Sequence, residues 1–155
     1  MSYATVLKQV KTILEAVAGV KNVHDYRRHS KFWDEFFKKH VGTEKVVNSW
    51  EITRTEMAQD IRAVQGAGGN EPFYFDTHFI LITGYFTVND ENATEITFQD
   101  LVDAVVAAFR VKPLLNNATI IPKEAQAPSI GHTMFGGVLV HTAEITFEAI
   151  EEVGG

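Results

Sequence analysis

The chain has 155 residues, 14 basic and 20 acidic side chains, a formal net charge of −6, and no cysteine. The lack of cysteine excludes disulfides, thiolate catalysis and cysteine-ligated metal sites. A chain of this length can bury about two-thirds of its unfolded surface, so we expect a single domain over residues 1–155. No apolar run suits a signal peptide or a membrane helix, so we expect a protein made in the cytoplasm without membrane contact.

The charge is distributed unevenly along the chain. Residues 21–45 contain seven lysines and arginines and four acidic side chains, a local balance of +3, so the remaining residues carry −9. The overall acidity argues against a protein that reads nucleic-acid sequence. One basic segment on an acidic protein favours an oriented contact with another protein, and a solvated loop with scattered charges is the alternative.

The first predicted element is an amphipathic helix over Tyr3–Val17. Ser2 is a suitable N-cap, and Gly19 follows where helices commonly end in the left-handed conformation. The apolar stripe of this helix consists of Val6, Leu7, Val10, Ile13, Leu14 and Val17. The next stretch, Val20–Arg28, is predicted to be a first strand.

An aromatic segment over Ser30–His40 follows, and a turn over Val41–Lys45 ends it. Its large side chains recur at helical spacing, which indicates a short helix or a structured excursion between strands. The aromatic residues are Phe32, Trp33, Phe36 and Phe37. With the neighbouring lysines they could stack on single-stranded nucleic acid, but Asp34 and Glu35 lie among them, which favours a core or interface role.

Residues Val46–Thr55 alternate between apolar and polar side chains, which predicts a strand. We expect a mobile loop over Met57–Pro72, with a helical turn at Gln59–Val64, because Gly66, Gly68 and Gly69 are costly to order. This glycine cluster lacks the lysine and hydroxyl residue of a phosphate-binding loop.

The stretch Phe73–Val88 reads as one strand about three times the usual length. It is apolar or aromatic on both faces. One face carries Phe73, Phe75, Phe79, Leu81 and Tyr85, and the other carries Tyr74, Ile80, Ile82 and Phe86. Each face therefore needs its own cover.

A turn at Asn89–Asn92 precedes a second amphipathic helix over Thr97–Val111, with Thr97 as its cap. Its stripe consists of Phe98, Leu101, Val102, Val105 and Phe109. A short strand at Ala118–Ile121 and a polar connector at Pro122–Pro128 are expected next.

The C-terminal part is predicted to begin with a flexible loop tip at Gly131–Gly137, which includes Met134 and Phe135. Val138–Ile150 then alternates for its whole length, with one dry face and one acidic face. The dry face has Leu139, Ala143, Ile145, Phe147 and Ala149, and the wet face has Thr142, Glu144, Thr146 and Glu148.

These elements predict an α+β fold. We expect a mixed, mainly antiparallel sheet with long strands and extended loops, and two amphipathic helices packed on one face.

Residues that could carry chemistry are few. Asp76 and His78 lie two positions apart on one face of the long strand, where they could share a proton or bind a metal with a third group. A structural role is the favoured reading, and near-pairs among the six histidines arise by chance. Glu151 and Glu152 are near the C-terminus, so we expect them to be solvated. No catalytic, metal-binding or cofactor-binding residue is assigned, and no cofactor is expected.

The long strand argues for self-assembly. Two helices can cover one face of a small sheet, and aromatic side chains left on the other face mark an interface. Strands that extend beyond their own domain can also pair with a second subunit. We expect Tyr74 or Phe86 to lie on the uncovered face, so that their replacement affects assembly more than folding.

Several features occur together in one known family. They are the chain length, the N-terminal helix ending in Ala18-Gly19-Val20, the two-strand excursion through Arg27-Arg28 and Trp50, the long strand before the helix at Thr97–Val111, and the acidic alternating strand at His141–Glu152. In this order they resemble the tail terminator proteins of long-tailed bacteriophages. The likeness covers most of residues 3–152 and is one of element order, without a diagnostic short motif.

The resemblance implies a virion structural protein that is not an enzyme. It implies a hexameric ring that caps the tail tube, stops its polymerisation and joins it to a head-side connector protein. DNA would pass through the lumen without specific binding. The wet face with Glu144, Glu148, Glu151 and Glu152 suits a lumen wall because like charge repels DNA, and Glu144 and Glu148 are the lumen candidates.

The same resemblance suggests where partners bind. The basic segment with Arg27 and Arg28 would meet an acidic partner surface, and the two glycine-rich loops would become ordered on contact. The interface candidates are Arg27, Arg28, Phe32, Trp33, Phe36, Phe37, Gly66, Gly68, Gly69, Tyr74, Phe86, Met134 and Phe135. Three alternatives remain: another neck or head–tail adaptor, a small α+β ligand- or metal-binding enzyme that uses Asp76 and His78, and a dimeric domain.

Overall fold

The computed structural model describes residues 3–26, 47–66, 69–89, 93–110, 125–135 and 138–153, and only the backbone of 61–66, 69–73, 135, 138, 152 and 153. Its helices are α1 (Tyr3–Glu15) and α3 (Thr94–Arg110). Its strands are β1 (Asn22–His24), β2 (Asn48–Gly66), β3 (Gly69–Thr87), β4 (Gln126–Phe135) and β5 (Val138–Val153).

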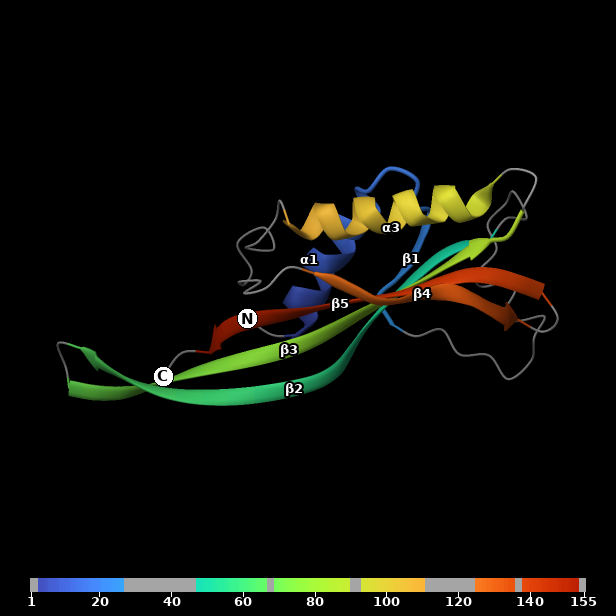
Figure 1. Ribbon diagram of the computed structural model, residues 1–155. Coiled ribbons are helices and arrows are strands. Elements are labelled where there is room, and N and C mark those ends of the chain that lie inside the picture. Colours follow the sequence, from blue (N-terminus) through green and yellow to red (C-terminus); the bar gives the residue numbers. More distant parts are fainter. Residues whose placement is uncertain are drawn as a thin grey trace.

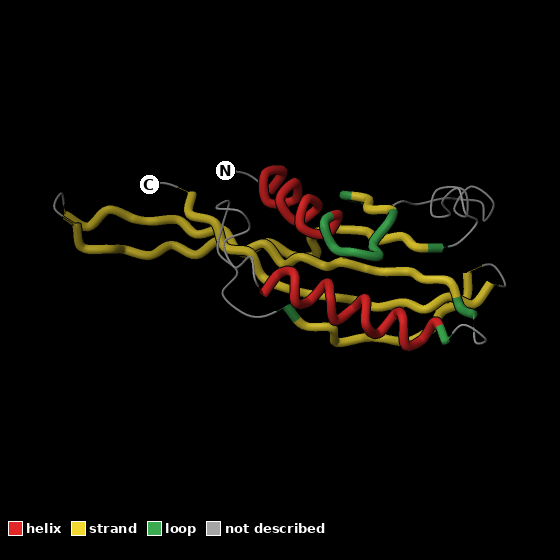
Figure 2. The backbone as a smooth tube through the Cα atoms, turned by 90° about the horizontal axis from the view of Figure 1, so that it is seen from above, coloured by secondary structure: helices red, strands yellow, loops and turns green. Residues whose placement is uncertain are grey.

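The five strands form one mixed sheet in the order β1-β2-β3-β5-β4. Only the short β1–β2 pair is parallel, and the other three pairs are antiparallel. Both helices lie on the same face of this sheet (Figures 1 and 2). The α+β fold class is therefore confirmed.

The core lies between the two helices and the sheet face beneath them, which we call the helix face. Both predicted helix stripes are buried there, apart from Leu7, which is half-buried. The sheet contributes Trp50, Ile52, Ile80, Ile82, Ala143, Ile145, Phe147 and Ala149. Apolar periodicity thus predicted which side of each helix is buried.

A junction at the end of α1 connects the helix to β1 and β2. Gly19 has a φ of 93°, as predicted for its position, and a Cβ there would lie 3.3 Å from Leu101. The Asn48 amide nitrogen donates to the Gly19 carbonyl at 2.7 Å, and its oxygen accepts from the Trp50 indole at 3.0 Å. One buried asparagine therefore satisfies polar groups from a helix end and from the core.

The predicted long strand is present as β3, and the helices cover one of its faces. Ile80 and Ile82 are buried on the helix face, and Phe86 packs against the same core with its ring 5.8 Å from that of Phe98. The expectation that Tyr74 or Phe86 lies on the uncovered face is therefore wrong, since Tyr74 has the same strand parity as Phe86 and belongs to the helix face. The opposite side, which we call the far face, carries Phe75, Phe79, Leu81 and Tyr85.

The expected mobile loop at Met57–Pro72, with its helical turn at Gln59–Val64, is wrong for the described residues. Met57–Gly66 belongs to β2 and Gly69–Pro72 belongs to β3, and the hairpin closes with the pair Gly66↔Gly69. The prediction counted the entropy of ordering glycine but not the ladder hydrogen bonds that an adjacent strand provides.

A β-bulge in β2 explains why its alternation does not continue in the sequence. Arg54 pairs with Ile80 and Glu56 pairs with Phe79, so Thr55 is an extra residue. Its hydroxyl donates to the Phe79 carbonyl at 3.4 Å. Because a bulge shifts the side-chain alternation by one position, Arg54 and then Met57 point to the helix face.

The β4–β5 hairpin also replaces part of an expected loop. Gly131–Phe135 lies in β4, not in a loop tip, and Pro128 lies in β4 beside a register shift instead of in a connector. Pro is tolerated at such an edge irregularity because no ladder bond is lost. The dry face of β5 is confirmed except for Leu139, which is 44% exposed near the hairpin end.

Several boundaries differ from the predictions. The second helix begins at Thr94, three residues before the expected cap Thr97, and the exposed Ile96 in its first turn obscured the apolar stripe. The first strand covers only Asn22–His24. Outside the described residues are Ser2, Ser30–His40, Val41–Lys45 and Ala118–Ile121.

The hairpin formed by β2 and β3 extends beyond the rest of the sheet. The last pair between β3 and β5 is Tyr74↔Val153, whereas β2 and β3 continue from Arg62↔Phe73 to Gly66↔Gly69. We call residues 62–66 and 69–73 the arm. Figure 1 shows it projecting past both helices.

Candidate functional site

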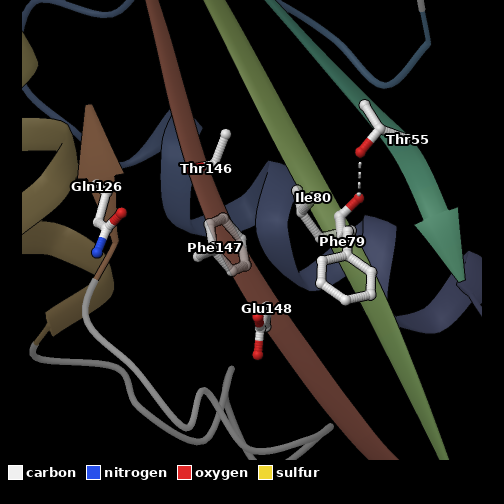
Figure 3. A pocket seen from close by; sticks show the side chains of 7 residues that line it. All are labelled: Thr55, Phe79, Ile80, Gln126, Thr146, Phe147 and Glu148. Carbon is white, nitrogen blue, oxygen red and sulfur yellow. Dashed lines mark hydrogen bonds between the residues drawn. The ribbon is translucent and has the colours of Figure 1, made fainter. Parts of the chain in front are cut away.

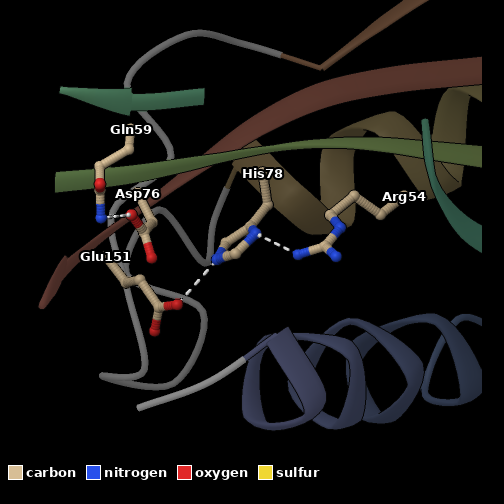
Figure 4. A network of polar contacts seen from close by, with 5 residues as sticks. All are labelled: Arg54, Gln59, Asp76, His78 and Glu151. Carbon is tan, nitrogen blue, oxygen red and sulfur yellow. Dashed lines mark hydrogen bonds and ion pairs between the residues drawn. The ribbon is translucent and has the colours of Figure 1, made fainter. Parts of the chain in front are cut away.

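A polar cluster with a buried centre lies where the N-terminal end of α1 meets the sheet, with Tyr3 half-buried and Arg54 exposed at its outer side. Its members are Tyr3 from α1, Arg54 from β2, His78 from β3 and Glu151 from β5, and we call it the His78 cluster. The side chains of His78 and Glu151 are only 2% and 3% exposed. Figure 4 shows His78 between Arg54 and Glu151.

The hydrogen bonds define the tautomer of His78. Its Nδ1 lies 3.2 Å from Nη1 of Arg54, and its Nε2 lies 2.7 Å from Oε1 of Glu151. Because a guanidinium only donates, Nδ1 must accept and the proton must be on Nε2. His78 is therefore a neutral imidazole that accepts from Arg54 and donates to the Glu151 carboxylate.

Tyr3 closes the cluster from the helix side. Its ring centroid is 5.8 Å from that of His78, and the Arg54 guanidinium carbon lies 4.3 Å from the centre of the Tyr3 ring, a cation–π distance. Burial raises the pKa of the Tyr3 phenol, although the Arg54 charge acts in the opposite direction. The Tyr3 phenol therefore loses its proton at a higher pH than an ordinary tyrosine does.

A second carboxylate lies next to the cluster. Asp76 is the direct cross-strand partner of Glu151, so the two side chains share one face of the sheet. Asp76 accepts a hydrogen bond from Gln59 at 3.2 Å, and not from His78. The second oxygen of Glu151, Oε2, is buried and accepts no hydrogen bond from any residue that the structure describes.

This arrangement is suited to holding elements together. A carboxylate–imidazole pair orients a general base in many enzymes, but both nitrogens of His78 are already bonded and the ring is buried. Within the described part of the chain, no three His, Asp or Glu side chains are grouped so that they could hold a metal ion. The cluster connects α1, β2, β3 and β5.

The structure corrects the expectation for Glu151. It was predicted to be solvated with Glu152 and grouped with the wet-face glutamates, but it lies buried on the helix face. The signal was present in the sequence: Glu151 continues the alternation of Ile145, Phe147 and Ala149, and His78 has the same parity as Ile80. The predicted pair of Asp76 and His78 thus becomes a pair of Glu151 and His78.

A cavity of about 230 Å³ lies across β2, β3 and β5 at the start of β4. It is lined by Thr55, Phe79, Ile80, Gln126, Thr146, Phe147 and Glu148. Figure 3 shows the Phe79 ring and the Glu148 carboxylate in this lining. Its acceptors are carboxylate, amide and hydroxyl oxygens.

The predicted interface residues are dispersed. Tyr74 is half-buried near the base of the arm, and Gly66 and Gly69 form the last pair at its tip. Met134 is 59% exposed on β4, and Phe135 ends that strand. Outside the described residues are Arg27, Arg28, Phe32, Trp33, Phe36, Phe37 and Gly68.

The predicted lumen residues share the far face. Glu144 is exposed and Glu148 is half-buried there, on the side opposite both helices. Glu144 is flanked by β3 and β4, whereas Glu148 lies beyond Gln126, the first residue of β4.

No protein-family model matches the chain, and no curated protein matches it. Among the described residues, neither helix has the length and apolar character needed to cross a bilayer.

Proposed function

We propose that the chain is a virion structural protein, the tail terminator of a long-tailed bacteriophage. In this role it forms a hexameric ring that caps the tail tube, stops its polymerisation and joins it to the head-side connector protein. The proposal rests on the resemblance of element order, and one structural observation, the arm, supports it most directly.

The arm needs a partner to be stable. It consists of five cross-strand residue pairs of β2 and β3 beyond the end of β5. An isolated two-stranded ribbon is at best marginally stable in water. Among the described residues, the two strands of the arm pair only with each other. An element of this kind is expected in a subunit that completes its fold by contact with neighbours.

The charge pattern is compatible with a ring around DNA. Glu144 and Glu148 lie on the far face, which neither helix covers, and we assign this face to the lumen. Like charge there discourages DNA from binding while it passes. The His78 cluster then has a structural role inside each subunit, and the protein acts without a cofactor and without catalysis.

The assembly state tests this proposal. Light-scattering mass and negative-stain images of the purified chain should show six-subunit rings, alone or with the tail tube protein of the same virus. A matched variant replaces Arg62–Phe73 with a two-residue Asn-Gly turn that joins Ile61 to Tyr74. This variant should keep its circular dichroism spectrum and lose ring formation.

Two results would contradict the proposal. One is a full-length chain that stays monomeric at high concentration and with tube protein. The other is a truncated variant that forms the same rings. Rings that form on a head-side connector but never on tube protein would instead favour a neck adaptor.

A further inference from the structure

Arg54 links the His78 cluster to the first residue of α1. Its guanidinium donates to Nδ1 of His78 at 3.2 Å and lies 4.3 Å from the centre of the Tyr3 ring. Because Arg54 is exposed, its guanidinium can leave this position without crossing the core. Figure 4 shows Arg54 on the side of His78 that is opposite Glu151. One side chain therefore connects a titratable ring to the start of a helix.

The bond between Arg54 and His78 exists only while the imidazole is neutral. A guanidinium donates and never accepts, so Nδ1 has to offer its lone pair. When a proton adds to Nδ1, an N–H points at the N–H of Arg54, and two positive charges face each other. The bond from Nε2 to Glu151, at 2.7 Å, is kept by the charged ring and becomes a pair of opposite charges. Protonation therefore strengthens one contact of His78 and breaks the other.

Charges of opposite sign lie on the two sides of this imidazole. Glu151 from β5 and Asp76 from β3 are cross-strand partners on one side, and Arg54 from β2 is on the other. The first residue of α1 contributes a neutral phenol, on which Asp25 after β1 acts through its charge. Among the described residues, no hydrogen bond or ring contact links His78 to α3. A protonated ring is therefore attracted to the β5 side and repels the guanidinium on the β2 side.

The rest of α1 stays in place when Arg54 leaves. The helix is anchored by side chains buried against the sheet, which are Val6, Val10, Ile13 and Leu14. Tyr3 precedes them, and a cation–π contact with Arg54 covers its ring. Loss of that contact therefore loosens the first turn of the helix and not the whole helix.

We propose that His78 and Arg54 form a pH-sensitive latch for the first turn of α1. Histidine is the side chain that takes up a proton between about pH 8 and pH 5. The contact with Arg54 is made only by the neutral ring, so it is present above this range and is lost as the pH falls through it. Below it, His78 keeps Glu151, Arg54 turns to solvent and the first turn opens. This device does not depend on the proposed ring.

Hydrogen exchange of the purified full-length chain, followed by mass spectrometry, tests the latch. Peptides that cover residues 3–10 report on it, because the amide of Leu7 bonds to the carbonyl of Tyr3 in an α-helix. After correction for the intrinsic effect of pH on exchange, these amides should exchange about fivefold faster at about pH 5.5 than at about pH 8. Equal corrected rates at the two pH values would overturn the proposal.

A pair of histidine variants assigns the response to one ring. His78→Gln keeps an acceptor for Arg54 and a donor for Glu151 but cannot titrate, so the response to pH should disappear. The matched control is His132→Gln, which removes an exposed histidine on β4 and should keep the full response. A response that persists in His78→Gln, or that is lost equally in both variants, would refute the latch.

Arg54→Met tests the other half of the latch. The substitution lies at an exposed position and removes the charge and the donor, so the first turn should exchange fast at both pH values. If this variant responds to pH like the parent, the proposal fails, and this result decides even where His78→Gln does not fold by circular dichroism. Asp76→Asn should respond like the parent. Loss of the response there would assign it to a carboxylate and overturn the role of His78.

Discussion

The Trp50 ring packs directly against Gly84 in the core. The two residues are cross-strand partners on β2 and β3, and both are buried. A Cβ on Gly84 would lie 2.5 Å from the Trp50 ring, closer than any real contact. Gly84→Ala should therefore lower the free energy of unfolding by about 1–3 kcal/mol, measured by urea denaturation.

Gly131→Ala is the control for that substitution. Gly131 also lies in a strand, but a Cβ there would have no neighbour within 4 Å. Alanine at this position should leave stability unchanged or raise it slightly, because it restricts the unfolded chain. Equal destabilisation by both substitutions would mean that loss of glycine itself, not contact with Trp50, is responsible.

The pair of His78 and Glu151 is a second residue-level test. His78→Leu leaves the buried Glu151 carboxylate without its donor, and should cost about 3–5 kcal/mol of unfolding free energy. The double replacement His78→Leu, Glu151→Leu removes both polar groups and should cost clearly less than His78→Leu alone. Urea denaturation of the single and double variants measures this coupling, and additive costs would refute a direct interaction.

Strand parity could have placed His78 and Glu151 on one face, but not in contact. Their hydrogen bond joins residues 73 positions apart, and only the β3–β5 register brings them together. The same holds for Arg54, which shares the face of Trp50 and Ile52 by parity but reaches His78 only through the β2–β3 register. Such a site depends on strand order and register, which leave no pattern in a single sequence.

At the scale of elements, the arm and the central sheet should differ in stability. The arm is a two-stranded ribbon, whereas residues 78–84 of β3 lie between β2 and β5 and under the helices. In hydrogen exchange followed by mass spectrometry, arm amides should exchange about a hundredfold or more faster than those of residues 78–84 in the isolated chain. Equal protection would show that the arm is stable without a partner.

Helices were easier to predict than strands in this chain. The stripes of α1 and α3 repeat every three to four residues within one segment, so burial follows from local sequence. In β2 and β4 the stabilising contacts come from neighbouring strands, and glycines and Pro128 signalled loops. Gly66 and Gly69 form the last pair of the β2–β3 hairpin, which is a role beside the turn that entropy alone does not reveal.

At the scale of the whole molecule, the separation of charge is relevant to assembly. The basic balance of residues 21–45 contrasts with Glu144 and Glu148 on the far face. Opposite charges on different parts of one subunit favour contacts between different surfaces of neighbouring copies, and such contacts form a ring when the rotation between copies closes. Arg27 and Arg28 belong to the basic part and lie outside the described residues.

Charge reversal at both arginines, to glutamate, should therefore weaken ring assembly and reduce its dependence on salt. Sedimentation velocity at low and high ionic strength measures both effects, since salt screens contacts between exposed charges. The matched control replaces Lys8 and Lys11 with glutamate. These residues lie on α1 outside the basic segment, and their reversal changes the net charge by the same amount. If both double variants weaken assembly equally, net charge alone explains the effect. If neither does, the basic segment is not an assembly surface.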